Sequence, residues 1–466
     1  MTEFSGPSFS DLDLTDPKPK SAYKPVRMVA GSFLAIILTG TLLLCLPISS
    51  RNMEVTPVLD ALFTATSATC VTGLSVYDTY LYFSPFGQTV ILLLIQLGGI
   101  GLITFTTFFT LAFRGKLGLR NMRLASESAN FGNTTGIQGI LSTVITVTFL
   151  CEAIGACFLA IRFVPAYGLH GVFISIFMAV SAYCNAGFDI LGFLGASQSL
   201  IPFANDPLVI LTIAFLIIFG GIGFIVFYDL LTSRRRGKKV HHLLLHSKIV
   251  LVTTGILLLL GTVCFLIFEY RNTLDGMGFF QKLMVSFFSS TTSRTAGFAA
   301  VDYGQVSDMT KFLTIILMFV GASPGSTGGG IKTATLVVVV MSVISVMRGY
   351  NDTIIFHKRV DKNTVYKAMA LIFVSMFLLV IALGVLVLLE PDFHALDLLF
   401  EAVSAYSTTG LSSAGTPNLS DPSQAILIFL MYIGRVGPLS FVLALSASHG
   451  SHGRNTTLPE GKVMIG

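Results

Sequence analysis

One short pattern ending in glycine recurs four times along the sequence. Each copy begins with Phe, places Gly ten residues later and continues with Leu or Phe. The copies read FTATSATCVTGL, FMAVSAYCNAGF, FFSSTTSRTAGF and FEAVSAYSTTGL. Their glycines are Gly73, Gly187, Gly297 and Gly410, separated by 114, 110 and 113 residues. Spacing this even indicates a fourfold internal repeat.

The residues before each glycine predict a loop that enters and leaves a membrane on the same side. They form a half-length helix at most, because a spanning helix needs roughly 20 residues. Non-helical backbone at membrane depth must face protein or a water-filled pathway, which four loops can do by converging on one axis. Their carbonyl oxygens would then replace the hydration shell of a monovalent cation, with glycine supplying the backbone angles. The predicted filter residues are Val71, Thr72, Gly73, Asn185, Ala186, Gly187, Thr295, Ala296, Gly297, Thr408, Thr409 and Gly410.

The alternative is that the four copies are small-residue helix ends that pack tightly in a membrane. Such contacts need no common spacing, whereas the four copies share one Phe-to-Gly distance. We therefore favour the pore.

The composition places these loops in an integral membrane protein. The chain has 466 residues, of which 53% are hydrophobic and only 11% charged, against about 25% charged residues in soluble domains. Its polar segments are too short to form a soluble domain, and its six cysteines have no metal-binding spacing. Its basic residues lie in short loops between apolar stretches, so we expect membrane lipid and no nucleic acid around the chain.

The charges of the loops predict the topology. Basic clusters at residues 18–27, 114–123, 234–239 and 348–367 alternate with acidic segments, which places the basic clusters and both termini in the cytoplasm. We predict an all-α membrane protein with eight transmembrane helices in four membrane-pore-membrane units and four re-entrant pore loops around one central pore. The predicted parts are a cytoplasmic N-terminal tail (1–27), pore units 28–113, 114–232, 233–347 and 348–447, and a cytoplasmic C-terminal tail (448–466).

The third unit contains a polar break in an apolar stretch. One proline and five glycines lie within ten residues, which cannot hold a helix. Beneath the filter such a segment could occlude the pathway. The alternative is a passive kink. We reject a phosphate-binding loop, because such a loop needs a preceding strand and none is expected here. The predicted gating segment is Gly321, Ala322, Ser323, Pro324, Gly325, Ser326, Thr327, Gly328, Gly329, Gly330 and the following Lys332.

Arg435 lies near the middle of the last apolar stretch. Placing arginine there costs about 2.5 to 3.5 kcal/mol, so we treat it as a candidate pore charge. The alternative is a structural ion pair with Glu152 or Glu401. Glycines in the other second spans predict contacts between inner helices. They are Gly98, Gly99, Gly101, Gly220, Gly221, Gly223, Gly434 and Gly437.

The four filters and four repeated units resemble the superfamily of Trk, Ktr and plant HKT potassium uptake proteins, in particular its bacterial Ktr-type pore subunits (KtrB). The resemblance implies K+ as the transported ion, no covalent cofactor, a gating loop at 321–330, and Arg435 in the pore below the filter. In this superfamily serine at the first filter position marks sodium-favouring members, whereas this chain has Gly73. Arg294 beside the third filter is a departure, and we expect it to point away from the ion.

The resemblance also implies a plasma-membrane homodimer on a cytoplasmic, KtrA-like ring of nucleotide-binding regulatory subunits, and possible sodium dependence. The competing function is an alternating-access secondary transporter of another cation or small solute, whose repeats are normally inverted. Here all four units start and end on the same side. The histidines show no HExxH or paired-carboxylate spacing, so we do not expect an enzyme.

Overall fold

The computed structural model describes residues 23–101, 137–235 and 243–437. The predicted tails are therefore described only in part, at residues 23–27 of the first. The basic residues Arg114, Lys116, Arg120 and Arg123, the basic residues at 236–239 and the end of the first unit at 102–113 also lie outside the described ranges.

The chain folds in four successive stretches. The first, residues 23–101, carries one long apolar helix, two shorter apolar helices and one helix of four residues. Asp78 caps the four-residue helix by accepting hydrogen bonds from Tyr80 N and Leu81 N, both at 2.9 Å. The elements are α1 (Tyr23–Cys45), η2 (Pro47–Ser49), α2 (Val58–Cys70), α3 (Thr79–Tyr82) and α4 (Pro85–Ile100).

The second stretch begins with a helix pair joined at Gly168. This glycine has φ +60° and ψ −137° inside α7 (Ile137–Tyr183), so the chain turns back there and the part after it forms the second short helix. The chain continues through η3 (Ile201–Phe203), α8 (Pro207–Ile222) and α9 (Phe224–Arg235).

The last two stretches repeat the order of long helix, short helix, loop and helix. The third contains α10 (Leu245–Glu269), α11 (Phe279–Thr292), α12 (Asp308–Phe319) and α13 (Thr333–Met347). An antiparallel hairpin of β1 (Ile354–Ile355) and β2 (Lys358–Arg359) follows. The fourth contains α14 (Lys362–Leu389), α15 (Ala395–Ser407), η5 (Thr416–Asn418) and α16 (Asp421–Val436).

Several apolar helices are too short to span a bilayer or are broken. Within the described ranges, four helices are long and apolar enough to span a bilayer, and α8 with α9, bent by 87°, makes five if the pair is one span. The helices α4 and α16 have 16 residues each and are followed by the C-cap residues Gly101 and Gly437, and α12 and α13 are separated by the polar break. The sequence predicted only the last of these interruptions.

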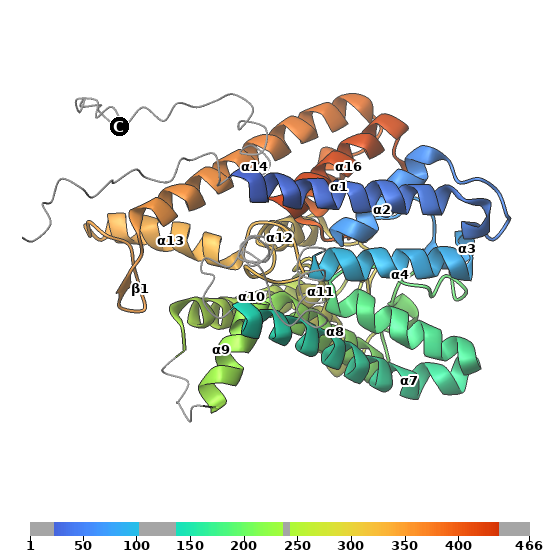
Figure 1. Ribbon diagram of the computed structural model, residues 1–466, viewed down its shortest axis with the longest axis horizontal. Helices are drawn as coiled ribbons and strands as arrows, with labels where there is room; N and C mark the ends of the chain where they lie inside the picture. The colour runs from blue at the N-terminus through green and yellow to red at the C-terminus, as the bar shows by residue number, and fades with distance from the viewer. Residues whose placement is uncertain (1–22, 102–136, 236–242, 438–466) are drawn as a thin grey trace, which may run out of the picture.

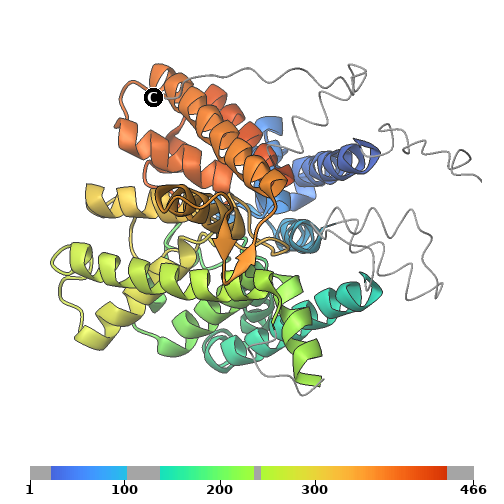
Figure 2. The same ribbon diagram turned by 90° about the vertical axis from the view of Figure 1, so that its left-hand side faces the viewer.

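Helices of successive stretches pack against one another around the centre of the molecule. Figure 1 shows α1, α4, α7 and α14 running along its long axis, with α3 at one end and the β1 hairpin at the other. Seen along that axis in Figure 2, the chain passes once around the centre in sequence order. The short helix α2 contacts α4 and α16, α8 contacts α11, and α12 contacts α15, so the last stretch returns to the first.

Two outer loops are fixed in the same way by a buried glutamate. Glu269, at the end of α10, accepts hydrogen bonds from the backbone N (2.9 Å) and Oγ (2.8 Å) of Ser307, the N-cap of α12. Glu390, just after α14, accepts the same two bonds from Ser420, the N-cap of α16, at 2.8 and 2.6 Å. Each carboxylate therefore ties the end of the long helix to the start of the helix that follows the filter loop.

Candidate functional site

The four repeat glycines form a closed ring. A Cβ on Gly73 would lie 2.5 Å from the carbonyl oxygen of Ala186, and one on Gly187 would lie 2.7 Å from that of Ala296. The remaining glycines, Gly297 and Gly410, pack in the same way against the carbonyl oxygens of Thr409 and Thr72. Each glycine thus contacts the residue before the next glycine, and the fourth contacts the first loop. The structure brings all four predicted loops together.

The backbone at the ring excludes side chains by conformation as well as by space. The four glycines have φ between +71° and +95°, where a residue with a side chain is strained. The residue two positions earlier is also left-handed in every copy, although it is never glycine. These residues are Val71, Asn185, Thr295 and Thr408, with φ of 60°, 60°, 66° and 52°.

Hydroxyl groups from the short helices hold the loops in two different ways. Ser67 and Ser404 accept hydrogen bonds from the backbone N of Gly73 (3.1 Å) and of Gly410 (3.0 Å). In the other two loops, Ser181 and Thr292 instead donate to the carbonyl oxygens of the residues after the glycine, at 2.6 and 2.7 Å. Those residues are Phe188 and Phe298, where the first and fourth copies have leucine. Loops with the same residue after the glycine therefore share one bracing pattern.

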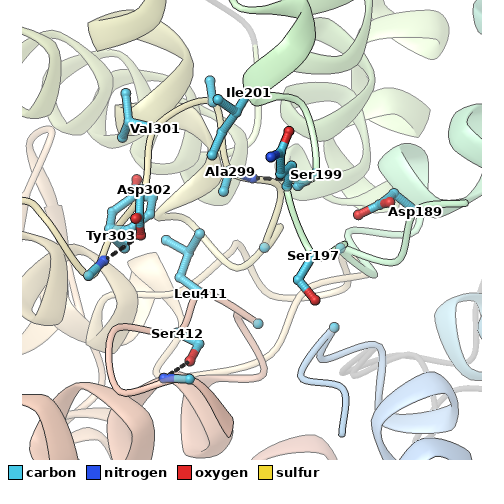
Figure 3. A pocket seen from close by; sticks show the side chains of 18 of the residues that line it. Asp189, Ser197, Ser199, Ile201, Ala299, Val301, Asp302, Tyr303, Leu411 and Ser412 are labelled. Carbon is cyan, nitrogen blue, oxygen red and sulfur yellow. Dashed lines mark hydrogen bonds between the residues drawn. The ribbon is translucent and has the colours of Figure 1, made fainter. Parts of the chain in front are cut away.

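A cavity of about 860 Å³ opens on one side of the ring, and all four glycines line it. Figure 3 shows this cavity with Asp189 and Asp302 among its lining residues, and Asp78 also lines it. Burial raises the pKa of Asp189 to about 6, with the nearby Asp78 carboxylate adding to the effect. None of the described residues that line the cavity is Lys or Arg. Its electrostatics therefore favour a cation over an anion.

The polar break lies on the opposite side of the ring and is bonded to the second stretch. Ser323 N donates to Gly221 O (3.1 Å), and Thr327 N donates to Gly220 O (3.3 Å). In return, Phe224 N donates to Gly325 O (2.8 Å) at the bend between α8 and α9. The bend between α8 and α9 and the break between α12 and α13 therefore satisfy each other's backbone groups.

The same segment packs directly beneath the filter loops. Gly328 lies against the Thr295 side chain and Gly329 against that of Thr408, so closely that a Cβ on either glycine would overlap a hydroxyl oxygen. Thr327 Oγ1 donates to Tyr183 O at 3.2 Å, at the start of the second loop. Residues 327–329 thus contact three of the four loops.

Arg435 connects the polar break to the first stretch through backbone carbonyls. Its guanidinium donates to Thr327 O in the break and to Gly98 O and Gly99 O of α4. In the described part of the chain neither glutamate considered as a partner pairs with it. Glu152 accepts from Gln96 at 3.2 Å, and Glu401 accepts from Ser412 and the loop that follows it. The alternative considered for Arg435, an ion pair with one of these glutamates, is therefore not found among the described residues.

Three of the inner-helix glycines make their closest contacts with the filter loops. Gly98, Gly220 and Gly434 pack so closely against the carbonyl oxygens of Thr69, Tyr183 and Tyr406 that none of the three has room for a Cβ. Each of these carbonyls lies four residues before a filter glycine. The tightest contact of each glycine is therefore with a filter loop, while Gly98 and Gly220 also accept hydrogen bonds from Arg435 and Thr327 of neighbouring second spans, as predicted. Each helix ends just beyond its contact, at a glycine with positive φ: Gly101, Gly223 or Gly437.

Arg294, beside the third filter glycine, faces α10. It is 6% exposed, and its Nη2 donates to Thr254 Oγ1 at 3.4 Å. Its Nε has no partner among the described residues. The contact with α10 agrees with the expectation that this arginine points away from the ring.

Comparison with known proteins identifies the family. The sequence model of the TrkH family, described as a cation transport protein, matches residues 11–455. The chain is 38% identical to Ktr system potassium uptake protein B of Bacillus subtilis over 95% of this chain and 97% of that protein. It is 37% identical to the potassium/sodium uptake protein NtpJ of Enterococcus hirae over 95% and 97% of the two chains.

A solved structure shows that the fold is shared as well. The potassium transporter TrkH from Vibrio parahaemolyticus superimposes on 93% of this chain and 86% of its own, with a TM-score of 0.70 at 16% identity. The relatives are transporters and not enzymes, and the apolar helices make this chain a multi-pass membrane protein. The chain belongs to the TrkH family of cation transport proteins.

Proposed function

We propose that this protein takes up K+ across the cell membrane through the ring formed by Gly73, Gly187, Gly297 and Gly410. The observation that carries the proposal is the closed ring of four glycines below an acid-lined cavity. Relatives described as potassium uptake proteins support K+ as the ion. The proposal includes the filter, the gate and the topology predicted from the sequence, in which the chain crosses the membrane eight times in four units.

In the filter, backbone carbonyls of the four tripeptides ending in these glycines replace the water around K+. Left-handed conformations at the first and third residue of each tripeptide favour carbonyls that line one side of the loop. The bracing hydroxyls, such as Ser67 and Ser404, hold the loops so that the oxygens do not collapse onto a smaller ion. The cavity carboxylates raise the local concentration of cations in front of the filter.

Residues 321–330 act as the gate in this proposal. They lie against three filter loops and are bonded to the broken end of α8. Arg435 adds a positive charge below the filter and bonds the gate to α4. Because the segment has few side chains and is held by hydrogen bonds, it can be displaced without unpacking a hydrophobic core.

The proposed assembly is a homodimer in the plasma membrane, with both termini cytoplasmic and a KtrA-like ring of nucleotide-binding regulatory subunits beneath. Relatives described as proteins of the Ktr system support a partner of this kind. A relative described as a potassium/sodium uptake protein supports a part for sodium.

Potassium uptake in cells that lack their own uptake systems tests the function. We expect expression of the chain to restore growth and K+ uptake at low external K+. A Gly187→Val variant is the negative control, because its side chain would enter the ring against Ala296 and Gly297. Equal uptake by this variant, inserted in the membrane at the wild-type level, argues that ions do not pass through the ring.

A further inference from the structure

Three consecutive carbonyls of the gating segment are each bound by a cationic side chain. Arg435 donates to Thr327 O, and Lys332 Nζ donates to Gly328 O at 2.6 Å and to Gly329 O at 3.4 Å. In the described part of the chain, no carboxylate lies within ion-pair distance of either cation. Among the described residues, the hydrogen-bond acceptors of both cations are therefore backbone oxygens, the type of ligand that a K+ pathway uses.

These carbonyls belong to residues directly beneath the filter. Gly328 and Gly329 contact Thr295 and Thr408, the first residues of two filter tripeptides. A cation at their carbonyls would therefore be the next one below the ring. The sequence of the segment here, Thr-Gly-Gly, also resembles the filter tripeptide Thr408-Thr409-Gly410 in its small residues and its glycine.

The position of Lys332 is unfavourable for its helix. Lys332 is the N-cap of α13, and no acidic residue lies in the first turn of that helix. The positive end of the helix dipole therefore repels the ammonium group. Arg435, by contrast, lies in the last turn of α16, where the dipole favours a positive charge. Of the two cations, Lys332 is the easier one to displace.

We propose that the carbonyl oxygens of Gly328 and Gly329 form an internal site for a monovalent cation, which the Lys332 ammonium group occupies in the closed protein. An ammonium group carries the same charge as K+ and binds the same carbonyl ligands. When Lys332 withdraws, K+ leaving the filter takes its place. The inference rests on the proposed function, since it assigns the next ion position along the same pathway.

The test is the position of rubidium, a heavy substitute for K+, in crystals of the purified full chain. In the wild-type protein we expect an anomalous peak at the glycine ring and none at Gly328 and Gly329. The Lys332→Met variant keeps most of the side-chain volume and removes the charge, so a second peak is expected at these two carbonyls. The matched control is Lys311→Met, which removes a buried lysine paired with Asp397 at the opposite end of α12 from the gating segment and adds no peak there.

A second variant guards against misfolding. Lys332→Gln removes the charge and keeps a polar side chain, and we expect the same additional peak. Rubidium at the ring but not at the segment in both neutral variants overturns this inference and leaves the proposed function standing. Rubidium missing from the ring itself contradicts the proposed function, and with it the inference.

Discussion

At each filter glycine, the conformation of the backbone and the neighbouring loop together exclude a side chain. Gly73 has φ +95° and lies against the carbonyl oxygen of Ala186. A residue other than glycine must shift that carbonyl, and carbonyl positions determine which ion is coordinated.

We expect Gly73→Ser to admit Na+ more readily relative to K+. A displaced carbonyl that costs K+ about 1.4 kcal/mol more than Na+ changes the ratio tenfold. The measurement is the ratio of Na+ to K+ flux. Gly31→Ser is the control, because a Cβ on Gly31 meets no atom within 4 Å. An unchanged ratio in the folded Gly73→Ser protein argues against carbonyl coordination at this ring.

The carbonyl contacts of Arg435 lead to a second prediction. Arg435→Ala removes a positive charge from the region below the filter and the bonds that join Thr327 to α4. We expect K+ flux per folded molecule to rise at least tenfold, because repulsion inside a protein is weakly screened. Thermal stability in detergent should fall by only about 1 to 3 kcal/mol, the usual cost of buried hydrogen bonds.

Arg162→Ala is the control for this change, since Arg162 is an exposed partner of Asp206. A large loss of stability without any gain in flux would show that Arg435 is structural. Neutralising Glu152 should not rescue such a loss, because Glu152 bonds to Gln96 instead.

Residue types with a strict repeat could be predicted from the sequence, whereas backbone contacts could not. The spacing of Gly73, Gly187, Gly297 and Gly410 indicated their convergence. Nothing indicated that Val71 is left-handed, since β-branched residues normally avoid that conformation. A sequence shows which carboxylates could pair with Arg435, but it does not show which backbone carbonyls the side chain binds.

Among the helices, the broken ones differ most from the expectation. The polar break at 321–330 was evident from its glycines and proline. The ends of α4 and α16 and the bend after α8 were not, because single glycines at 101, 223 and 437 are common within membrane helices. Each follows a helix that packs against a filter loop, so the breaks come from tertiary contacts.

The gating segment gives an element-scale prediction. Deleting residues 326–329 removes the contacts with Thr295, Thr408 and Arg435 and keeps the bond between Ser323 and Gly221. We expect K+ flux to increase and to become less dependent on any cytoplasmic partner. The measurement is flux with and without that partner, with a folding control by gel filtration and thermal unfolding. Wild-type flux in the folded deletion variant indicates that the segment is only a kink.

In the whole molecule, four weakly similar units behave as one closed ring. The chain passes around the centre once, and α2 of the first unit contacts α16 of the last (Figure 2). The repeat predicted this closure, because four copies of one loop can bury their polar backbone only against one another. The cavity in front of the ring could not be predicted, since its acids come from loops of unequal length.

The central claim is that K+ moves through this ring down its own gradient. The most direct test is ion flux through the purified chain in liposomes with equal sodium on both sides and a gradient of K+ alone, measured for the wild type and the 326–329 deletion. We expect K+ flux that carries net charge, exceeds Na+ flux and is larger in the deletion variant. Transport that requires stoichiometric exchange or co-transport of another ion in both proteins would contradict the account and favour an alternating-access transporter.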